Sequence, residues 1–253
     1  MLDLVMVAAA SGLAGFVDAI VGGGGLILVP ALFAAYPAAA PATLFGTNKG
    51  GAIWGTAWAA LQFARRVTLD RRTLAWGMGG ALAGAFCGAW VVTLVPADGL
   101  KKALPLVLLA ILAYTLAKKQ LGREHAPRHQ GAAEARVALA IGLAIGFYDG
   151  FFGPGTGSFF VFLFVRLLGY DFLHASAAAK RLNTATNFAA LVLFASTGHV
   201  WWRVAAVLAV MNIAGSLLGT RLALSRGAGF VRGVFIVVVS ALIVKTGYDA
   251  FLR

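Results

Sequence analysis

The feature that most constrains this chain is a series of long apolar blocks separated by short polar connections. A block of about 20 apolar residues is long enough to cross the roughly 30 Å hydrocarbon core of a membrane as a helix. Strands of a membrane barrel would instead alternate in polarity over about ten residues, and the blocks show no such alternation. The sequence therefore predicts an all-α membrane protein with about eight transmembrane segments. The blocks span residues 4–35, 42–64, 74–95, 103–117, 137–168, 182–198, 204–224 and 231–251.

Composition agrees with this fold class. Charged residues make up only 12% of the 253 residues, about half of the usual fraction in a soluble domain. The net charge of +12 could suggest a nucleic-acid partner, but membrane proteins concentrate Lys and Arg in cytoplasmic loops without one. We expect membrane lipid and no nucleic acid as a partner, and a multi-pass location in a bacterial-type inner membrane. The start, Met1 to Asp3, lacks the basic region of a signal peptide, so the first block should remain in the membrane.

The two halves of the chain match when the sequence is shifted so that Asp18 falls on Asp149. The same constant shift, called the repeat shift below, aligns Lys49 with Lys180, Gly22 with Gly153 and Gly24 with Gly155. Only 9 of the 253 residues are acidic, so the match of two aspartates is uncommon by chance. The sequence predicts two homologous four-segment membrane repeats, 1–122 and 137–253, joined by a polar linker, 123–136. In transporters with internal repeats, the substrate site lies at the repeat interface near the membrane midplane.

The relative orientation of the repeats stays open at this stage. Four crossings in each half would make the repeats parallel, whereas an odd number would invert the second one. Inversion would place the basic stretches 65–72 and 221–232 on the same side, as the positive-inside rule favours.

The first block of each half is too long for one straight crossing. At 1.5 Å per residue, 32 residues would form a helix of about 48 Å. Glycines interrupt both blocks, at 22–25 and at 153–157, where Pro154 adds a second helix breaker. Irregular backbone at membrane depth is tolerated only where protein or a water-filled cavity surrounds it. We therefore expect glycine-broken or re-entrant helices in both halves.

An aspartate precedes each glycine run, Asp18 in the first half and Asp149 in the second. An acid inside a membrane segment is a functional hypothesis by default. Each could carry a coupling proton, or could anchor the irregular loop by accepting backbone N–H bonds. The glycine runs have two interpretations as well, because exposed N–H groups attract anions and because glycine permits close helix packing.

Lys49 and Lys180 follow the irregular segments at equivalent positions, with asparagines nearby. A cation with amide and hydroxyl partners suits an oxyanion, whereas a lysine at the membrane surface would snorkel to the headgroups. Thr43, Gln62, Asn212 and Thr220 are expected to form interhelical hydrogen bonds, and the linker histidines His125 and His129 to be loop residues. The predicted substrate-binding residues are Gly22, Gly24, Asn48, Lys49, Gly153, Gly155, Thr156, Lys180, Asn183 and Asn187.

The glycine segments carry a family resemblance. Residues 15–30, 146–154 and Thr47-Asn48-Lys49 together resemble the TauE/SafE sulfite-exporter family, most closely its YfcA-type branch, over essentially the whole chain. The resemblance implies secondary transport of a small sulfur-containing anion, such as sulfite, sulfoacetate or thiosulfate.

We find no catalytic or metal-ligand constellation in the sequence, so we expect a transporter without a cofactor and not an enzyme. The alternatives are a membrane scaffold or assembly subunit and, less favoured, an intramembrane enzyme. A homo-oligomer, the coupling ion and the direction of transport stay open.

Overall fold

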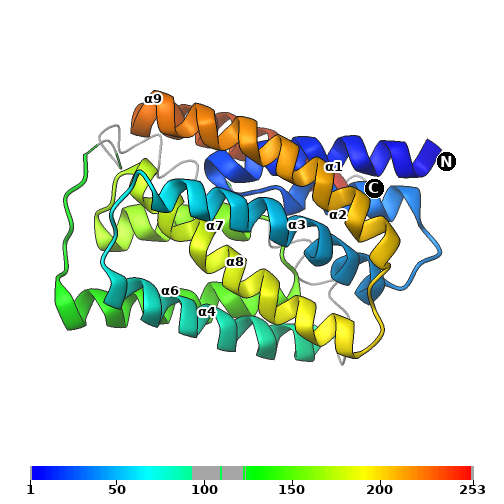
Figure 1. Ribbon diagram of the computed structural model, residues 1–253, viewed down its shortest axis with the longest axis horizontal. Helices are drawn as coiled ribbons and strands as arrows, with labels where there is room; N and C mark the ends of the chain where they lie inside the picture. Colours follow the sequence, from blue (N-terminus) through cyan, green and yellow to red (C-terminus); the bar gives the residue numbers. More distant parts are fainter. Residues whose placement is uncertain (1, 93–108, 110–121, 123, 252–253) are drawn as a thin grey trace.

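The computed structural model describes residues 2–92, 109, 122 and 124–251 (Figure 1). Every regular element in this part of the chain is helical, so the expectation of an all-α fold is confirmed. The predicted fourth segment, 103–117, lies outside the described residues apart from Leu109. The elements are α1 (Leu2–Val21), α2 (Gly25–Ala35), α3 (Pro41–Ala64), α4 (Arg71–Val92), α6 (Gly131–Phe151), α7 (Thr156–Leu163), the π-helix η1 (Phe164–Leu168), α8 (Phe172–Ser196) and α9 (Trp202–Phe251).

Among the described residues, four helices are long and apolar enough to cross a membrane: α1, α4, α6 and the Trp202–Ala241 part of α9. The helices α3 and α8 are as long, with 24 and 25 residues, but each carries buried polar residues in its middle. The helix α9 is two helices that meet at Gly227, where φ is +72°. This kink separates the two apolar blocks that the sequence places there.

Local chemistry explains where several helices begin. The carboxylate of Asp70 accepts the Thr73 N–H at 2.7 Å before α4, and that of Asp171 accepts the His174 N–H at 2.7 Å before α8. Such caps satisfy backbone donors that a helix leaves free at its start. Pro41 begins α3, at a position where its missing N–H costs nothing. The helix α6 begins at Gly131, so the last part of the stretch expected as a linker is helical.

The first block of each half breaks at its glycines, as the sequence predicts. In the first half, α1 ends at Val21 and α2 begins at Gly25. The chain then folds back on itself, so that Gly24 packs against α1. The contact is too close for a side chain, since a Cβ added to Gly24 would lie 2.6 Å from the Ala14 carbonyl oxygen. In the second half, Gly155 separates α6 from α7 with φ at +87°, a conformation that only glycine adopts readily.

Glycine packing joins α4 to α6 and α1 to α9 side by side. A side chain at Gly84 or Gly88 of α4 would overlap with the carbonyl groups of α6, at Leu143 and Phe147 respectively. A side chain at Gly215 or Gly219 of α9 would overlap with α1 in the same way, at Gly12 and Phe16. The repeat shift carries each contact of one pair onto a contact of the other. The partner numbers rise together, so the two helices of each pair run parallel.

Three helices of the first half run in the opposite direction to the helices that the repeat shift places on them: α1 to α6, α3 to α8, and α4 to the first part of α9. In Figure 1, α1, α3 and the first part of α9 run from right to left, whereas α4, α6 and α8 run from left to right. The helices α3 and α8 cross at the centre in antiparallel fashion, with Gly46 against Phe194 and Gly50 against Leu191. The α3–α4 connection and the kink of α9 consequently lie at the same end of the molecule, where one cavity is lined by Arg65, Arg66 and Arg221.

Candidate functional site

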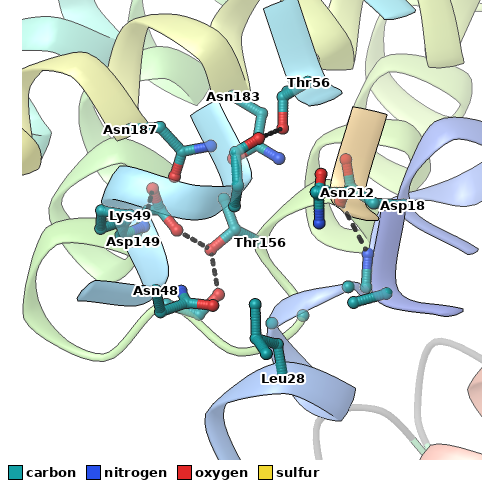
Figure 2. Close-up of a pocket in the computed structure, with 18 residues that line it drawn as sticks. Asp18, Leu28, Asn48, Lys49, Thr56, Asp149, Thr156, Asn183, Asn187 and Asn212 are labelled. Carbon is teal, nitrogen blue, oxygen red and sulfur yellow. Dashed lines mark hydrogen bonds and ion pairs between the residues drawn. The ribbon is translucent and has the colours of Figure 1, made fainter. Parts of the chain in front are cut away.

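A small cavity lies at the centre of the bundle, where the two glycine breaks meet α3 and α8 (Figure 2). Its volume is about 30 Å³, which is room for on the order of two water molecules. A sulfur oxyanion has at least four heavy atoms and needs more space than this volume offers. The cavity is lined by most of the sequence-predicted residues: Asp18, Gly24, Asn48, Lys49, Asp149, Gly153, Gly155, Thr156, Asn183 and Asn187.

An ion pair between the two halves forms one side of the cavity. Lys49 Nζ lies 2.7 Å from Asp149 Oδ2, and the two side chains are only 6% and 2% exposed. The Thr156 hydroxyl donates a hydrogen bond to Asp149 Oδ1 at 2.7 Å. The carboxylate thus joins α3, α6 and α7, with both of its oxygens engaged.

A second ion pair crosses the halves in the opposite sense. Lys180 Nζ lies 3.2 Å from Asp18 Oδ2 and also donates to the Asp18 backbone carbonyl. The Gly23 N–H donates to Asp18 Oδ1 at 3.3 Å. The Asp18 carboxylate therefore accepts a backbone N–H from the glycine run, which is the geometry that the loop-anchoring interpretation requires.

Burial of the lysines disfavours the snorkelling alternative for both. Lys180 is completely buried and points to Asp18 rather than to the bundle surface. It does not line the cavity, unlike Lys49.

The expected segment 182–198 was wrong at its start, because α8 begins at Phe172. Lys180 therefore lies inside α8 and not before it. A buried helix can contain this lysine because its charge is paired with Asp18.

Gly22, another residue predicted to bind substrate, packs against the second glycine break. A Cβ on Gly22 would overlap with the backbone of Gly157, and a Cβ on Gly157 would overlap with Gly22. The Ser158 hydroxyl donates to the Gly22 carbonyl across the same contact. Gly22 does not line the cavity. The two glycine breaks therefore hold each other in place beside the site.

Two polar residues that line the cavity were not among the residues predicted to bind substrate. Asn212 donates to the Ser11 carbonyl at 3.1 Å, which confirms its expected interhelical bond, but it also lines the cavity, as does Thr56. The repeat shift places Thr56 on Asn187, so the register of the two halves could have identified it. No comparable signal identified Asn212.

Asn48 presents a polar group that has no partner. Its side chain is 6% exposed, and its Oδ1 has no hydrogen-bond partner among the described residues. A buried polar atom without a partner costs about 1–3 kcal/mol. The cavity thus has an amide oxygen that is free to accept a hydrogen bond from a water molecule or a ligand. The amides of Asn183 and Asn187 line the same cavity (Figure 2).

A separate cluster lies at the start of α8. His125 stacks on His174 with ring centroids 3.9 Å apart, and His174 Nδ1 lies 2.8 Å from Asp171 Oδ2. Burial and the neighbouring His174 lower the pKa of His125. Burial raises the pKa of Asp171, but hydrogen bonds from His174 outweigh it and bring the pKa below its ordinary value. The expected loop residue His125 thus attaches the polar linker to α8.

Related proteins agree on one family and one class of function. A family model described as Sulfite exporter TauE/SafE matches residues 7–246. The probable membrane transporter protein YfcA of Escherichia coli (strain K12) is 38% identical over 238 residues, which cover 94% of this chain and 87% of the relative. Probable membrane transporter protein ORF9 of Sinorhizobium sp is 37% identical, with 92% and 88% covered. A probable membrane transporter protein of Haemophilus influenzae is 34% identical, with 93% and 91% covered. No solved structure matches the chain.

Proposed function

The chain belongs to the sulfite exporter TauE/SafE family, as the glycine segments indicated, and we propose that it is a secondary transporter of a small sulfur-containing oxyanion or organosulfonate. Its relatives are named probable membrane transporters, which favours transport over catalysis. We place it in the inner membrane and take export from the cytoplasm as its direction.

The observation that carries this proposal is the pair of buried Lys–Asp contacts around one polar cavity. Lys49 and Asp149 pair at 2.7 Å and Lys180 and Asp18 at 3.2 Å, so the four charges sum to zero. An anion entering this site must compete with a carboxylate for Lys49. Protonation of Asp149 would remove that competitor and keep the loaded site neutral, which matters because an unpaired buried charge is costly. We therefore propose that a proton accompanies the anion.

We further propose that the two halves are homologous repeats with inverted orientation. The glycine contacts that recur under the repeat shift support the repeat. The opposite directions of α1 and α6 (Figure 1) support the inversion, with the α1–α2 and α6–α7 hairpins entering from opposite membrane faces. Inverted repeats give a transporter two related conformations that open to opposite sides.

Charge sets the proposed orientation in the membrane. The connection between α3 and α4 contains Arg65, Arg66, Arg71 and Arg72, and the kink of α9 lies beside Arg221 and Arg226. These arginines lie at one end of the bundle, so the positive-inside rule makes that end cytoplasmic.

Flux through purified protein in liposomes tests the function. We expect efflux of at least one anion from a panel of sulfite, thiosulfate and sulfoacetate. A Lys49→Gln variant should lose most of this flux, because Lys49 lines the cavity. A scaffold would give no flux of any anion in the panel, and an enzyme would convert its substrate chemically.

A further inference from the structure

A second, larger cavity opens at the arginine-rich end of the bundle. Its volume is about 650 Å³, and it lies between the end of α3, the start of α8 and the middle of α9. The polar residues that line it are Gln62, Arg65, Arg66, Thr220, Arg221 and Ser225. Unlike the central cavity, it is large enough for a hydrated anion.

The three arginines of this second cavity, Arg65, Arg66 and Arg221, are exposed and have no carboxylate partner in the part of the chain that the structure describes. Thr220 is 1% exposed, and its hydroxyl has no hydrogen-bond partner there either. Guanidinium groups present several N–H donors in a fixed geometry that fits oxyanions. Three of them beside a free hydroxyl therefore form a site for a tetrahedral or trigonal oxyanion.

A line of polar side chains leads from this cavity to the central one. Asn212, Ser216 and Thr220 follow each other at four-residue intervals and share one face of α9. Asn212 lines the central cavity and Thr220 the second one. Between them, the Ser216 hydroxyl donates to the Gly55 carbonyl at 2.7 Å.

The corresponding face of α4 has no such line. The repeat shift places these three residues on Ala81, Ala85 and Ala89, and all three alanines are completely buried. Of these two equivalent helix faces, the face of α9 is therefore the polar one, and it leads toward the arginine-rich end. Asn212 and Ser216 each donate to a carbonyl group of a neighbouring helix. The Thr220 hydroxyl, at the second cavity, has no such partner among the described residues.

From these observations we propose that the second cavity is a vestibule that binds the oxyanion before it reaches the central site. The direction of entry rests on the proposed function, but binding in the vestibule does not require transport. The phosphate of an anionic lipid shares the same chemistry. The polar line toward Asn212 favours a free ion, since a free ion can move on to the central cavity, whereas a lipid headgroup stays attached to its acyl chains at the membrane surface.

Thiol labelling measures the electrostatic potential in this vestibule and its occupancy by an anion. Ser225 lines it, and the exposed Cys87 is replaced by serine to give a cysteine-free background. Ser225→Cys is then labelled with an anionic and a cationic methanethiosulfonate reagent in phosphatidylcholine nanodiscs. The matched control is Ser196→Cys at the far end of α8, because both serines are exposed and donate to the carbonyl three residues earlier.

We expect the ratio of anionic to cationic labelling rates to be at least about tenfold higher at position 225 than at 196. Millimolar sulfate, an unreactive probe, should slow labelling at 225 only. Arg221→Gln should abolish both effects, whereas Arg203→Gln, at the other end of the same helix segment, should preserve them. Equal ratios at the two positions, or no protection by sulfate, would overturn the proposal. Protection by phosphatidylglycerol but not by sulfate would identify a lipid site and overturn the vestibule as well.

Discussion

Lys49 and Asp149 lie 100 residues apart in the sequence, yet they form a buried ion pair of 2.7 Å at the centre of the bundle. Lys180 and Asp18 form the reciprocal pair. Each lysine therefore neutralises the aspartate of the other half. The two halves are held together at the point where an anion is proposed to bind, so a change in these pairs should affect both stability and transport.

Removal of one partner of the Lys49–Asp149 pair should destabilise the protein more than removal of both. Lys49→Gln or Asp149→Asn alone leaves a buried charge without a partner, which costs about 3–5 kcal/mol. The Lys49→Gln/Asp149→Asn double variant leaves no unpaired charge. Thermal unfolding in detergent of the three variants and the wild type gives the coupling. Additive losses in the double variant would show that the pair is not coupled.

Asp18 should tolerate asparagine better than alanine. An amide oxygen can still accept the Gly23 N–H, whereas alanine leaves that donor unpaired at about 1–3 kcal/mol. Both variants leave Lys180 without its charge partner, so that cost cancels in the comparison. The difference in unfolding temperature between Asp18→Asn and Asp18→Ala measures the anchoring. Equal temperatures for the two variants would contradict it.

Gly157→Ala should destabilise the junction of the two glycine breaks. Gly157 is helical, so the substitution adds no backbone strain, but its new methyl group would overlap with Gly22. Gly79→Ala is the matched control, because Gly79 is also helical and has no atom within 4 Å of the added Cβ. We expect a clear loss of thermal stability for Gly157→Ala and none for the control. A Gly157→Ala protein as stable as wild type would mean that the junction can widen freely.

The sequence predicts much of this architecture because polar and helix-breaking residues inside apolar segments are informative. Asp149 and Lys49 could be selected since a membrane segment carries an ionisable residue only at a high cost. The breaks at 22–25 and 153–157 follow from the weak helix propensity of Gly and Pro. These signals are local, and each of them needs only a few consecutive residues.

The remaining features depend on contacts between distant segments. The spacing from Asp18 to Lys49 equals that from Asp149 to Lys180, which allows pairing within a half as well as between halves. Gly22 was predicted to bind substrate. Its contact with Gly157 could not be foreseen, because that contact depends on how the two glycine breaks dock against each other. Asn212 is one polar residue on an apolar helix, and only the packing of α1 beside α9 brings it to the cavity.

The proposed topology predicts the labelling side of three cysteines. In the Cys87→Ser background, Arg71→Cys and Arg226→Cys should react with an impermeant thiol reagent from the cytoplasmic side, since both flank the arginine-rich end. Ser196→Cys, at the opposite end of the bundle, should react from the outside. Labelling is compared in intact cells and in inside-out vesicles. Reaction of positions 71 and 226 from opposite sides would exclude inverted repeats.

Proton-driven accumulation in proteoliposomes tests the central claim, that Asp149 and Lys49 couple a proton to an oxyanion. The assay uses whichever anion of the sulfite, thiosulfate and sulfoacetate panel gives the highest flux, with wild type and Asp149→Asn reconstituted at equal amounts of folded protein. Wild type should accumulate the anion when a pH gradient is imposed. Asp149→Asn should exchange the anion across the membrane but should not accumulate it, because the amide carries no titratable proton. Undiminished pH-driven accumulation by Asp149→Asn would contradict the account.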